Sequence, residues 1–226
     1  MADVARPTLR DLLAEIRDVT HDLPSFLTAP FFRRRHLHWG ATPAEVDSSL
    51  PGDALLSDAQ FKATRAITID VPPADVGPWL VQVGCLRAGW YSNDLLDNLG
   101  HPSATTIVPD LQGLEVGQWV PMSPSGAPSL KTAFKVHSFR VGEWLLWSKP
   151  DSTWAWQLTP TDDNGTRLVT RIRAVYDWRH PLTAVLGVLL MEFGDFAMCR
   201  RMLGGIKARA ESLSPDCRRV EASPCA

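Results

Sequence analysis

A long helix is the clearest element that the hydrophobic pattern predicts, and it lies near the end of the chain at residues 181–213. Steps of three and four residues, the spacing of one helical face, join Leu182, Val185, Leu186, Leu189, Phe193 and Phe196. Pro181 suits the first turn, and at 1.5 Å per residue the helix is about 45 Å long. Residues 182–193 are apolar nearly all round, so we expect a sheet to enclose this first half.

A membrane span is the alternative interpretation of this helix, and its length argues against it. The uninterrupted apolar run covers only residues 182–191, about half of the roughly 20 residues that a bilayer needs. Glu192, Asp195 and Arg200 follow at once. We therefore interpret the segment as the core helix of a globular domain, without stable membrane insertion.

Strand patterns precede the long helix. The first covers residues 62–71, and two short helices, at 74–83 and 92–99, follow it. Five later segments predict strands: 118–122, 133–139, 144–149, 153–159 and 167–178. Short turns separate several of them, so we expect neighbouring strands to form an antiparallel meander. The predicted order is one strand, two helices, several strands and one long helix.

The first 60 residues depart from this pattern. Residues 8–20 predict an amphipathic helix, and residues 23–51 are rich in proline. Thr42 and Glu45 stand at the spacing of a capping box that starts a short helix. We divide the chain into an N-terminal helical extension (1–60), a main domain (61–213) and a flexible tail (214–226). The sequence leaves open whether the extension caps a cavity or covers a sheet edge.

The main domain resembles a known superfamily in its element order and in two motifs. These are TRAITIDVPP at residues 64–73 and WLVQVG at residues 79–84. With them, the chain resembles the START-like or SRPBCC superfamily, the helix-grip group that includes polyketide cyclases, lipid-transfer domains and hormone receptors. The motifs WGAT at 39–42, LPGD at 50–53 and GWYSND at 89–94 look like a bacterial branch of mostly unassigned function.

The resemblance implies an α+β helix-grip fold. Its expected form is a curved antiparallel sheet of about seven strands around the C-terminal helix, with a cavity between sheet and helix. Members bind sterols, phospholipids, flavonoids or polyketides there, and some catalyse cyclisation or dehydration. The superfamily has no universal catalytic motif, so the resemblance implies a ligand class and no particular reaction.

Composition narrows the expected partners. The formal charge of −2 gives no general attraction to nucleic acid, and four scattered cysteines without a CxxC pair favour a reducing cytoplasm. The basic residues 33–36 beside Phe31 and Phe32 could touch a membrane or a nucleic acid, but a solvated loop is the simpler interpretation. Motifs for nucleotides and metal ions are missing, so we expect no cofactor and no metal site. A monomer or a homodimer is expected.

Nine tryptophans are the unusual feature of the composition, and large rings line ligand cavities as well as cores. Trp154 and Trp156 share one face of a strand. We expect that face to point inward, because two adjacent exposed tryptophans would form a rare apolar patch. The candidate ligand-binding residues are Trp79, Tyr91, Asp94, Trp154, Trp156, Leu189, Glu192 and Phe193.

Three residues are candidates for catalysis. Glu192 stands among apolar neighbours, where a desolvated carboxyl group suits acid–base chemistry. The Tyr91 hydroxyl would orient a carbonyl group at the cavity rim. Arg171 alternates with apolar residues along the last strand, so we expect it outside, in a solvated basic ladder. A bulge in that strand would instead turn Arg171 toward a ligand carboxylate or enolate.

These observations leave three functions open. The first is the binding of a hydrophobic small molecule, lipid-like or polyketide-like, without catalysis. The second is an aromatase/cyclase-type enzyme in which positioning supplies much of the rate acceleration. The third is a partner-binding domain whose cavity is filled by its own tryptophans, and a structure without an internal void would favour it.

Overall fold

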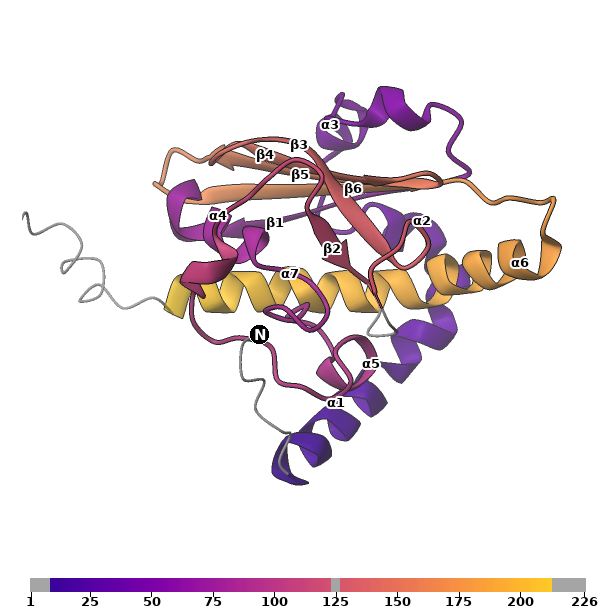
Figure 1. The fold of residues 1–226 in the computed structure, drawn as a ribbon, viewed down its shortest axis with the longest axis horizontal. Helices are drawn as coiled ribbons and strands as arrows, with labels where there is room; N and C mark the ends of the chain where they lie inside the picture. Colours follow the sequence, from indigo (N-terminus) through magenta and orange to yellow (C-terminus); the bar gives the residue numbers. More distant parts are fainter. Residues whose placement is uncertain (1–8, 123–126, 213–226) are drawn as a thin grey trace, which may run out of the picture.

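An antiparallel sheet is the centre of the structure, a computed structural model that describes residues 9–122 and 127–212 (Figure 1). Its six strands pair in the order β1-β6-β5-β4-β3-β2. They are β1 (Phe61–Ile69), β2 (Trp119–Pro121), β3 (Ala133–Arg140), β4 (Trp144–Lys149), β5 (Ser152–Pro160) and β6 (Thr166–Ala174). Strands β2 to β6 form the predicted meander, and β1 pairs with β6. The expected tail at 214–226 lies outside the described residues.

Helical segments precede, interrupt and follow the sheet. Before β1 come α1 (Leu9–Thr28), η1 (Ala29–Phe32), α2 (Arg33–Leu37), α3 (Pro43–Asp47) and η2 (Asp53–Leu56). Between β1 and β2 lie α4 (Pro73–Val81), α5 (Asp94–Asp97) and η3 (Pro109–Leu111). After β6, one continuous helix comprises α6 (Pro181–Leu189), the π-helical turn η4 (Leu190–Gly194) and α7 (Asp195–Ser212). The predicted α+β helix-grip fold is confirmed, with six strands among the described residues instead of about seven.

The sheet holds α7, the second half of the long helix. Residues at helical spacing on α7 enter the main core: Cys199, Met202, Leu203, Ile206 and Ala210. The expectation that residues 182–193 are enclosed is wrong, because Leu182 is 87% exposed and Val185, Leu186 and Leu189 are exposed as well. Nine-residue strands span about 30 Å, whereas the whole helix runs to about 48 Å, so the sheet covers only part of it.

The N-terminal segment covers the opposite face of the sheet. A second, smaller core forms there from Leu50, Ala66, Leu146, Ala155 and Val169. Helix α3 begins at the predicted capping box, in which Glu45 N donates to Thr42 Oγ1 and Thr42 N donates to Glu45 Oε2. Residues 40–57 of the extension therefore cover a face of the sheet, whereas α1 packs against α7 and contributes Phe26 to the wall of a cavity.

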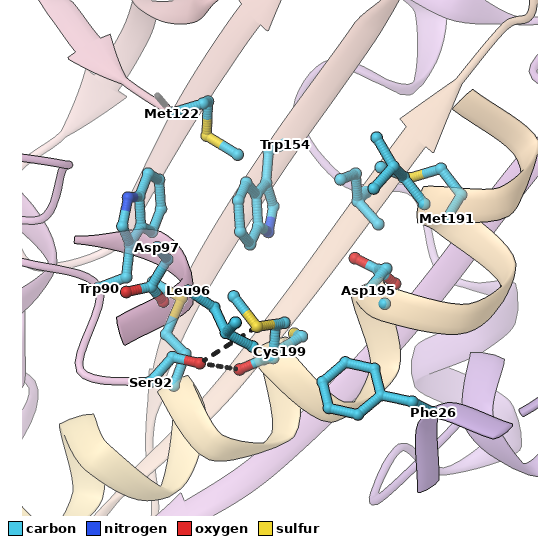
Figure 2. Close-up of a pocket in the computed structure, with 15 residues that line it drawn as sticks. Phe26, Trp90, Ser92, Leu96, Asp97, Met122, Trp154, Met191, Asp195 and Cys199 are labelled. Atoms are coloured by element: carbon cyan, nitrogen blue, oxygen red, sulfur yellow. Dashed lines mark hydrogen bonds between the residues drawn. The ribbon is translucent and has the colours of Figure 1, made fainter. Parts of the chain in front are cut away.

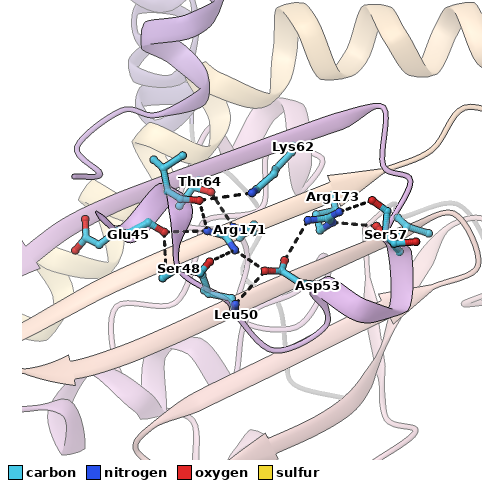
Figure 3. Close-up of polar contacts among 11 residues, drawn as sticks. Glu45, Ser48, Leu50, Asp53, Ser57, Lys62, Thr64, Arg171 and Arg173 are labelled. Carbon is cyan, nitrogen blue, oxygen red and sulfur yellow. Dashed lines mark hydrogen bonds and ion pairs between the residues drawn. The ribbon is translucent and has the colours of Figure 1, made fainter. Parts of the chain in front are cut away.

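The alternation predicted for β6 is right, and the predicted solvation of its arginines is wrong. Leu168 and Ile172 belong to the main core, so Arg171 points to the outer face. There the α3–η2 segment covers Arg171, which is only 1% exposed and lies in a network of hydrogen bonds (Figure 3). Together with the half-buried Arg167 and Arg173, Arg171 binds residues 40–57 to the outer face of the sheet.

Candidate functional site

A cavity of about 390 Å³ lies between the inner face of the sheet, the α5 region and the junction of η4 with α7 (Figure 2). Its walls come from α1, α5, three strands or their ends, and the long helix. The lining residues are Phe26, Trp90, Ser92, Leu96, Asp97, Met122, Trp154, Ile172, Leu190, Met191, Gly194, Asp195, Met198, Cys199 and Met202. Leu96, Met122 and Leu190 are also exposed, so the cavity opens to the surface beside these three side chains.

One wall of the cavity is aromatic. The rings of Trp90 and Trp154 are parallel within 6°, with centroids 5.7 Å apart. Trp154 also stacks on Trp156 at 5.0 Å and meets Trp147 edge to face at 5.6 Å. The Trp154 indole N–H donates to Thr170 Oγ1 at 2.8 Å, which fixes the ring and satisfies its polar atom. The wall therefore offers a rigid, flat apolar surface.

The remaining walls are rich in sulfur. Four of the five methionines of the chain line the cavity: Met122, Met191, Met198 and Met202. Methionine is flexible and polarisable, so such walls adapt to ligands of different shape. Cys199 lines the cavity too; burial raises the pKa of its thiol to about 11, although Arg65 acts in the opposite direction. The thiol is therefore protonated at neutral pH and is a packing group rather than a nucleophile.

A buried ion pair forms the polar end of the cavity. Asp195, at the start of α7, lines the cavity and lies 2.6 Å from Arg65 Nη2 on β1. Both side chains are almost fully buried, at 7% and 2% exposed. Burial lowers the pKa of Arg65, but the attraction of Asp195 outweighs it and the net shift is upward. Arg65 Nε also donates to the His36 carbonyl oxygen at 2.8 Å, so the guanidinium ties α2, β1 and α7 together.

His36 lies behind this ion pair, on the α2 side. Its ring stacks on Phe196 at 3.8 Å, almost parallel. Burial, together with the positive charge of Arg65, lowers the pKa of His36, so the imidazole is neutral at pH 7. The acidic side chains that line the cavity are Asp195 and Asp97.

The predicted ligand-binding residues divide between the cavity and other parts of the fold. Trp154 lines the cavity, and Trp156, which faces inward as expected, packs behind it in the core. Trp79, on α4, is fully buried in the main core. The Tyr91 hydroxyl accepts a hydrogen bond from Gln82 and donates to the Trp79 carbonyl oxygen. Asp94 accepts hydrogen bonds from Ser103. Tyr91 and Asp94 lie along a polar surface groove on the other side of α7, not in the cavity.

The three candidates on the long helix lie beside the cavity without lining it. Leu189 is exposed, Phe193 is half-buried, and Glu192 forms an ion pair with Arg33 at 2.7 Å. The π-helical turn η4 adds a residue to the helical repeat and so shifts which side chains face inward. Leu190, Met191, Gly194 and Asp195 consequently line the cavity instead. Arg171, the third catalytic candidate, lies on the outer face of the sheet.

Sequence reasoning missed the polar end of the cavity. A signal for Arg65 was present, because this arginine stands in the inward, apolar register of β1 with Ala63 and Ile69. The methionines gave no indication of a shared site, because their positions along the chain are scattered and only the fold brings four of them together. Among the described residues, no group of three or more metal-ligating side chains is close enough to hold a metal ion.

Comparison with known proteins adds structural likeness at low identity. No protein-family model and no curated protein matches the chain. A polyketide-cyclase-like protein from Corynebacterium glutamicum, Cgl2372, is 14% identical with a TM-score of 0.42, covering 66% of this chain and 91% of its own. A Thermobifida fusca protein is 15% identical with a TM-score of 0.42, covering 68% of this chain and 95% of its own. SSP2350 from Staphylococcus saprophyticus is 11% identical with a TM-score of 0.40, covering 67% of this chain and 92% of its own. The fold is therefore assigned from its own sheet and helix.

Proposed function

We propose that this protein binds a hydrophobic small molecule, lipid-like or polyketide-like, in the cavity between the sheet and the η4–α7 junction. The observation that carries the proposal is the cavity itself, which is about 390 Å³, apolar and open to the surface. Ligand sites are typically concave and mostly apolar, with a few polar groups that fix orientation, and run from about 300 to 1,000 Å³. A cytoplasmic location belongs to the same proposal.

The walls define the chemistry of the ligand. The stacked Trp90 and Trp154, which both line the cavity, suit contact with a flat ring system or a conjugated chain. The Asp195 carboxylate accepts hydrogen bonds, and its negative charge is already compensated by Arg65. The ligand that fits these walls is a largely apolar molecule with a hydroxyl group near one end.

The enzymatic alternative loses its three predicted catalytic residues. Glu192, Tyr91 and Arg171 have other partners and do not line the cavity. Asp195 and Asp97 are the cavity-lining carboxyl groups available for acid–base chemistry, and the protonated Cys199 thiol is unsuited to nucleophilic catalysis. A cyclase function would therefore depend on one or both of these carboxyl groups. The partner-binding alternative called for a cavity filled by tryptophans, and the open cavity beside Trp154 counts against it.

Two glycines on the same long helix provide a matched test. Gly194 lines the cavity and Gly204 lies ten residues further along, outside it. A Cβ atom added at either position meets no atom within 4 Å. Gly194→Leu therefore fills part of the cavity without a backbone clash, whereas Gly204→Leu adds the same side chain elsewhere.

Binding is measured with N-phenyl-1-naphthylamine, an uncharged fluorescent probe, after extraction of any molecule that co-purifies. The wild-type protein is expected to bind the probe at one site, and Gly194→Leu to weaken binding by about tenfold or more, as loss of one good apolar contact surface implies. Gly204→Leu should stay within about twofold of wild type. Equal affinity in all three proteins, or no binding by the extracted wild type, contradicts the proposal. Native mass spectrometry before extraction would identify the class of a bound molecule.

A further inference from the structure

One end of the molecule exposes an unusual number of large apolar side chains. We name it the apolar end and define it by Phe31, Phe32, Trp178, Leu182, Val185, Leu186, Leu189 and Leu190, all exposed. Leu182 and Phe31 are the extremes, at 87% and 84% exposed. Single exposed leucines are ordinary on protein surfaces, but a contiguous group of this kind marks an interaction site.

Contacts between three segments make these side chains one surface. The η1 segment, which carries Phe31 and Phe32, packs against η4, and η4 continues α6 (Figure 1). Tyr176 joins the third segment, because its ring meets that of Trp178 at 6.4 Å and it lies against Gly187 of α6. Helix α6 projects beyond the sheet, at the end opposite α4 (Figure 1).

Arginines flank this apolar end. Arg34 and Arg35 come two and three residues after Phe32, and Arg179 follows Trp178; all three are exposed and form no ion pair with another described residue. Glu192 is already paired with Arg33, whereas Asp177 contacts His180 and lies close enough to Arg179 for their charges to interact. Arg34 and Arg35 therefore supply the unpaired positive charge of this flank, on a chain whose formal charge is −2.

We propose that the apolar end docks onto the surface of a membrane that contains anionic lipids. Exposed aliphatic and aromatic side chains with arginines beside them are the composition of an interfacial membrane-binding surface. Aliphatic side chains of α6 enter the boundary between headgroups and acyl chains, and the arginines lie at the level of the lipid phosphates.

The helix docks and does not span. Residues 181–212 form a helix long and apolar enough to cross a bilayer, with a mean hydropathy of 1.7 in its most apolar window. However, Met202, Leu203 and Ile206 of its second half are enclosed by the sheet. A spanning helix would have to leave that core. Of the long helix, therefore, α6 and η4 are the parts that can contact lipid.

A second copy of the chain fits this surface less well. Two-fold dimers bring the same patch of both subunits together. Arg34 and Arg35 would then approach their own copies without a paired carboxylate, which disfavours association. Anionic headgroups instead complement these charges.

Docking at this end would place the cavity mouth near the bilayer. Leu190 belongs to the apolar end and also lines the cavity. A hydrophobic molecule would then pass between bilayer and cavity without crossing water. This step rests on the proposed function, whereas docking itself does not.

Vesicle flotation tests the docking with the full chain. We expect the protein to float with vesicles of phosphatidylcholine and phosphatidylglycerol, far less with phosphatidylcholine alone, and less at high salt because salt screens the arginines. Leu182→Gln/Leu186→Gln should weaken binding to the mixed vesicles by about tenfold or more. Arg34→Gln/Arg35→Gln should weaken it by roughly thirtyfold.

Two control variants distinguish docking by the apolar end from a general loss of surface apolarity and from ligand binding in the cavity. Leu55→Gln/Val141→Gln changes two exposed aliphatic side chains away from the apolar end and should float like wild type. Gly194→Leu should also float normally, because it alters the cavity and not the surface, so docking and ligand binding succeed or fail separately. The proposal is overturned if wild type binds neither kind of vesicle, or if the Leu182→Gln/Leu186→Gln protein binds as well as wild type. It is also overturned if the wild-type protein binds no vesicles and sediments as a dimer, and the Leu182→Gln/Leu186→Gln protein sediments as a monomer.

Discussion

Replacing Arg171 with methionine removes the central cation from the outer face of the sheet. The guanidinium donates hydrogen bonds at 2.6–2.9 Å to Thr64 Oγ1, Ser48 O, Asp53 Oδ2, Glu45 O and Val46 O (Figure 3). Three of these acceptors are carbonyl oxygens at the C-terminal end of α3, a helix of five residues. Such a short helix is unstable alone, so its position depends on Arg171 and on the capping box.

The structure sets the expected size of the effect. Loss of one partner from a buried charged network typically costs about 3–5 kcal/mol. Asp53 keeps a 3.0 Å hydrogen bond from Leu50 N and a 3.4 Å contact with Arg173, so its carboxylate is not left alone. The unpaired carbonyl oxygens remain, and we expect Arg171→Met to lower the free energy of unfolding by about 4 kcal/mol.

Urea unfolding followed by circular dichroism measures this loss. With a slope near 2.5 kcal/mol/M, a loss of about 4 kcal/mol moves the midpoint down by about 1.5 M. Arg140→Met is the control, because Arg140 is 67% exposed and pairs with the equally exposed Glu143; it should cost less than about 0.5 kcal/mol. A loss below about 1 kcal/mol for Arg171→Met would refute the structural role. A folded Arg171→Met protein with altered probe affinity would show that Arg171 acts on the cavity after all.

Two further substitutions test neighbouring parts of the fold. A hydrogen bond from Arg167 lowers the pKa of Glu45 to about 2, so this carboxylate stabilises the fold above its unfolded pKa near 4.5 and loses that effect as the pH falls toward 2. Glu45→Gln should therefore flatten the pH dependence of the melting temperature between these values, and an unchanged profile contradicts the assignment. A Cβ atom at Gly205 would collide with the Tyr91 carbonyl oxygen, whereas one at Gly204 meets open space. Thermal melts should show Gly205→Ala destabilised by about 2 kcal/mol and Gly204→Ala slightly stabilised.

Periodicity predicted most of the fold because it reports local geometry. The alternation in β6 separated Leu168 and Ile172 from Arg171 correctly, and the shared face of Trp154 and Trp156 does point inward. The alternation of residues along a strand does not show what covers the outer face of the sheet. Whether an outward arginine meets water or another segment depends on where residues 40–57 fold, and that is a matter of long-range packing.

The site was harder to predict because a single turn changes the phase of the helix. Regular α-helical spacing groups Leu189, Glu192 and Phe193 with the buried face that begins at Phe196. The π-helical turn from Leu190 to Gly194 breaks that spacing, so Asp195 lines the cavity and Glu192 pairs with Arg33. A turn of this kind has no strong sequence signature. The ring stack of Trp90 on Trp154 likewise joins residues 64 positions apart and appears only in the folded chain.

The incorrect prediction for the first half of the long helix bears on function. Helical spacing identified Leu182, Val185, Leu186 and Leu189 as apolar, and an apolar helix was assigned to the core. The main core forms without them, since the long helix contributes to it through α7, together with α4 and the strands. Their apolarity is therefore not explained by folding, and exposure of so many aliphatic groups promotes non-specific association unless something covers them. A surface that is apolar without serving the core, bordered by unpaired arginines and beside the cavity mouth, is best explained by contact with anionic lipid.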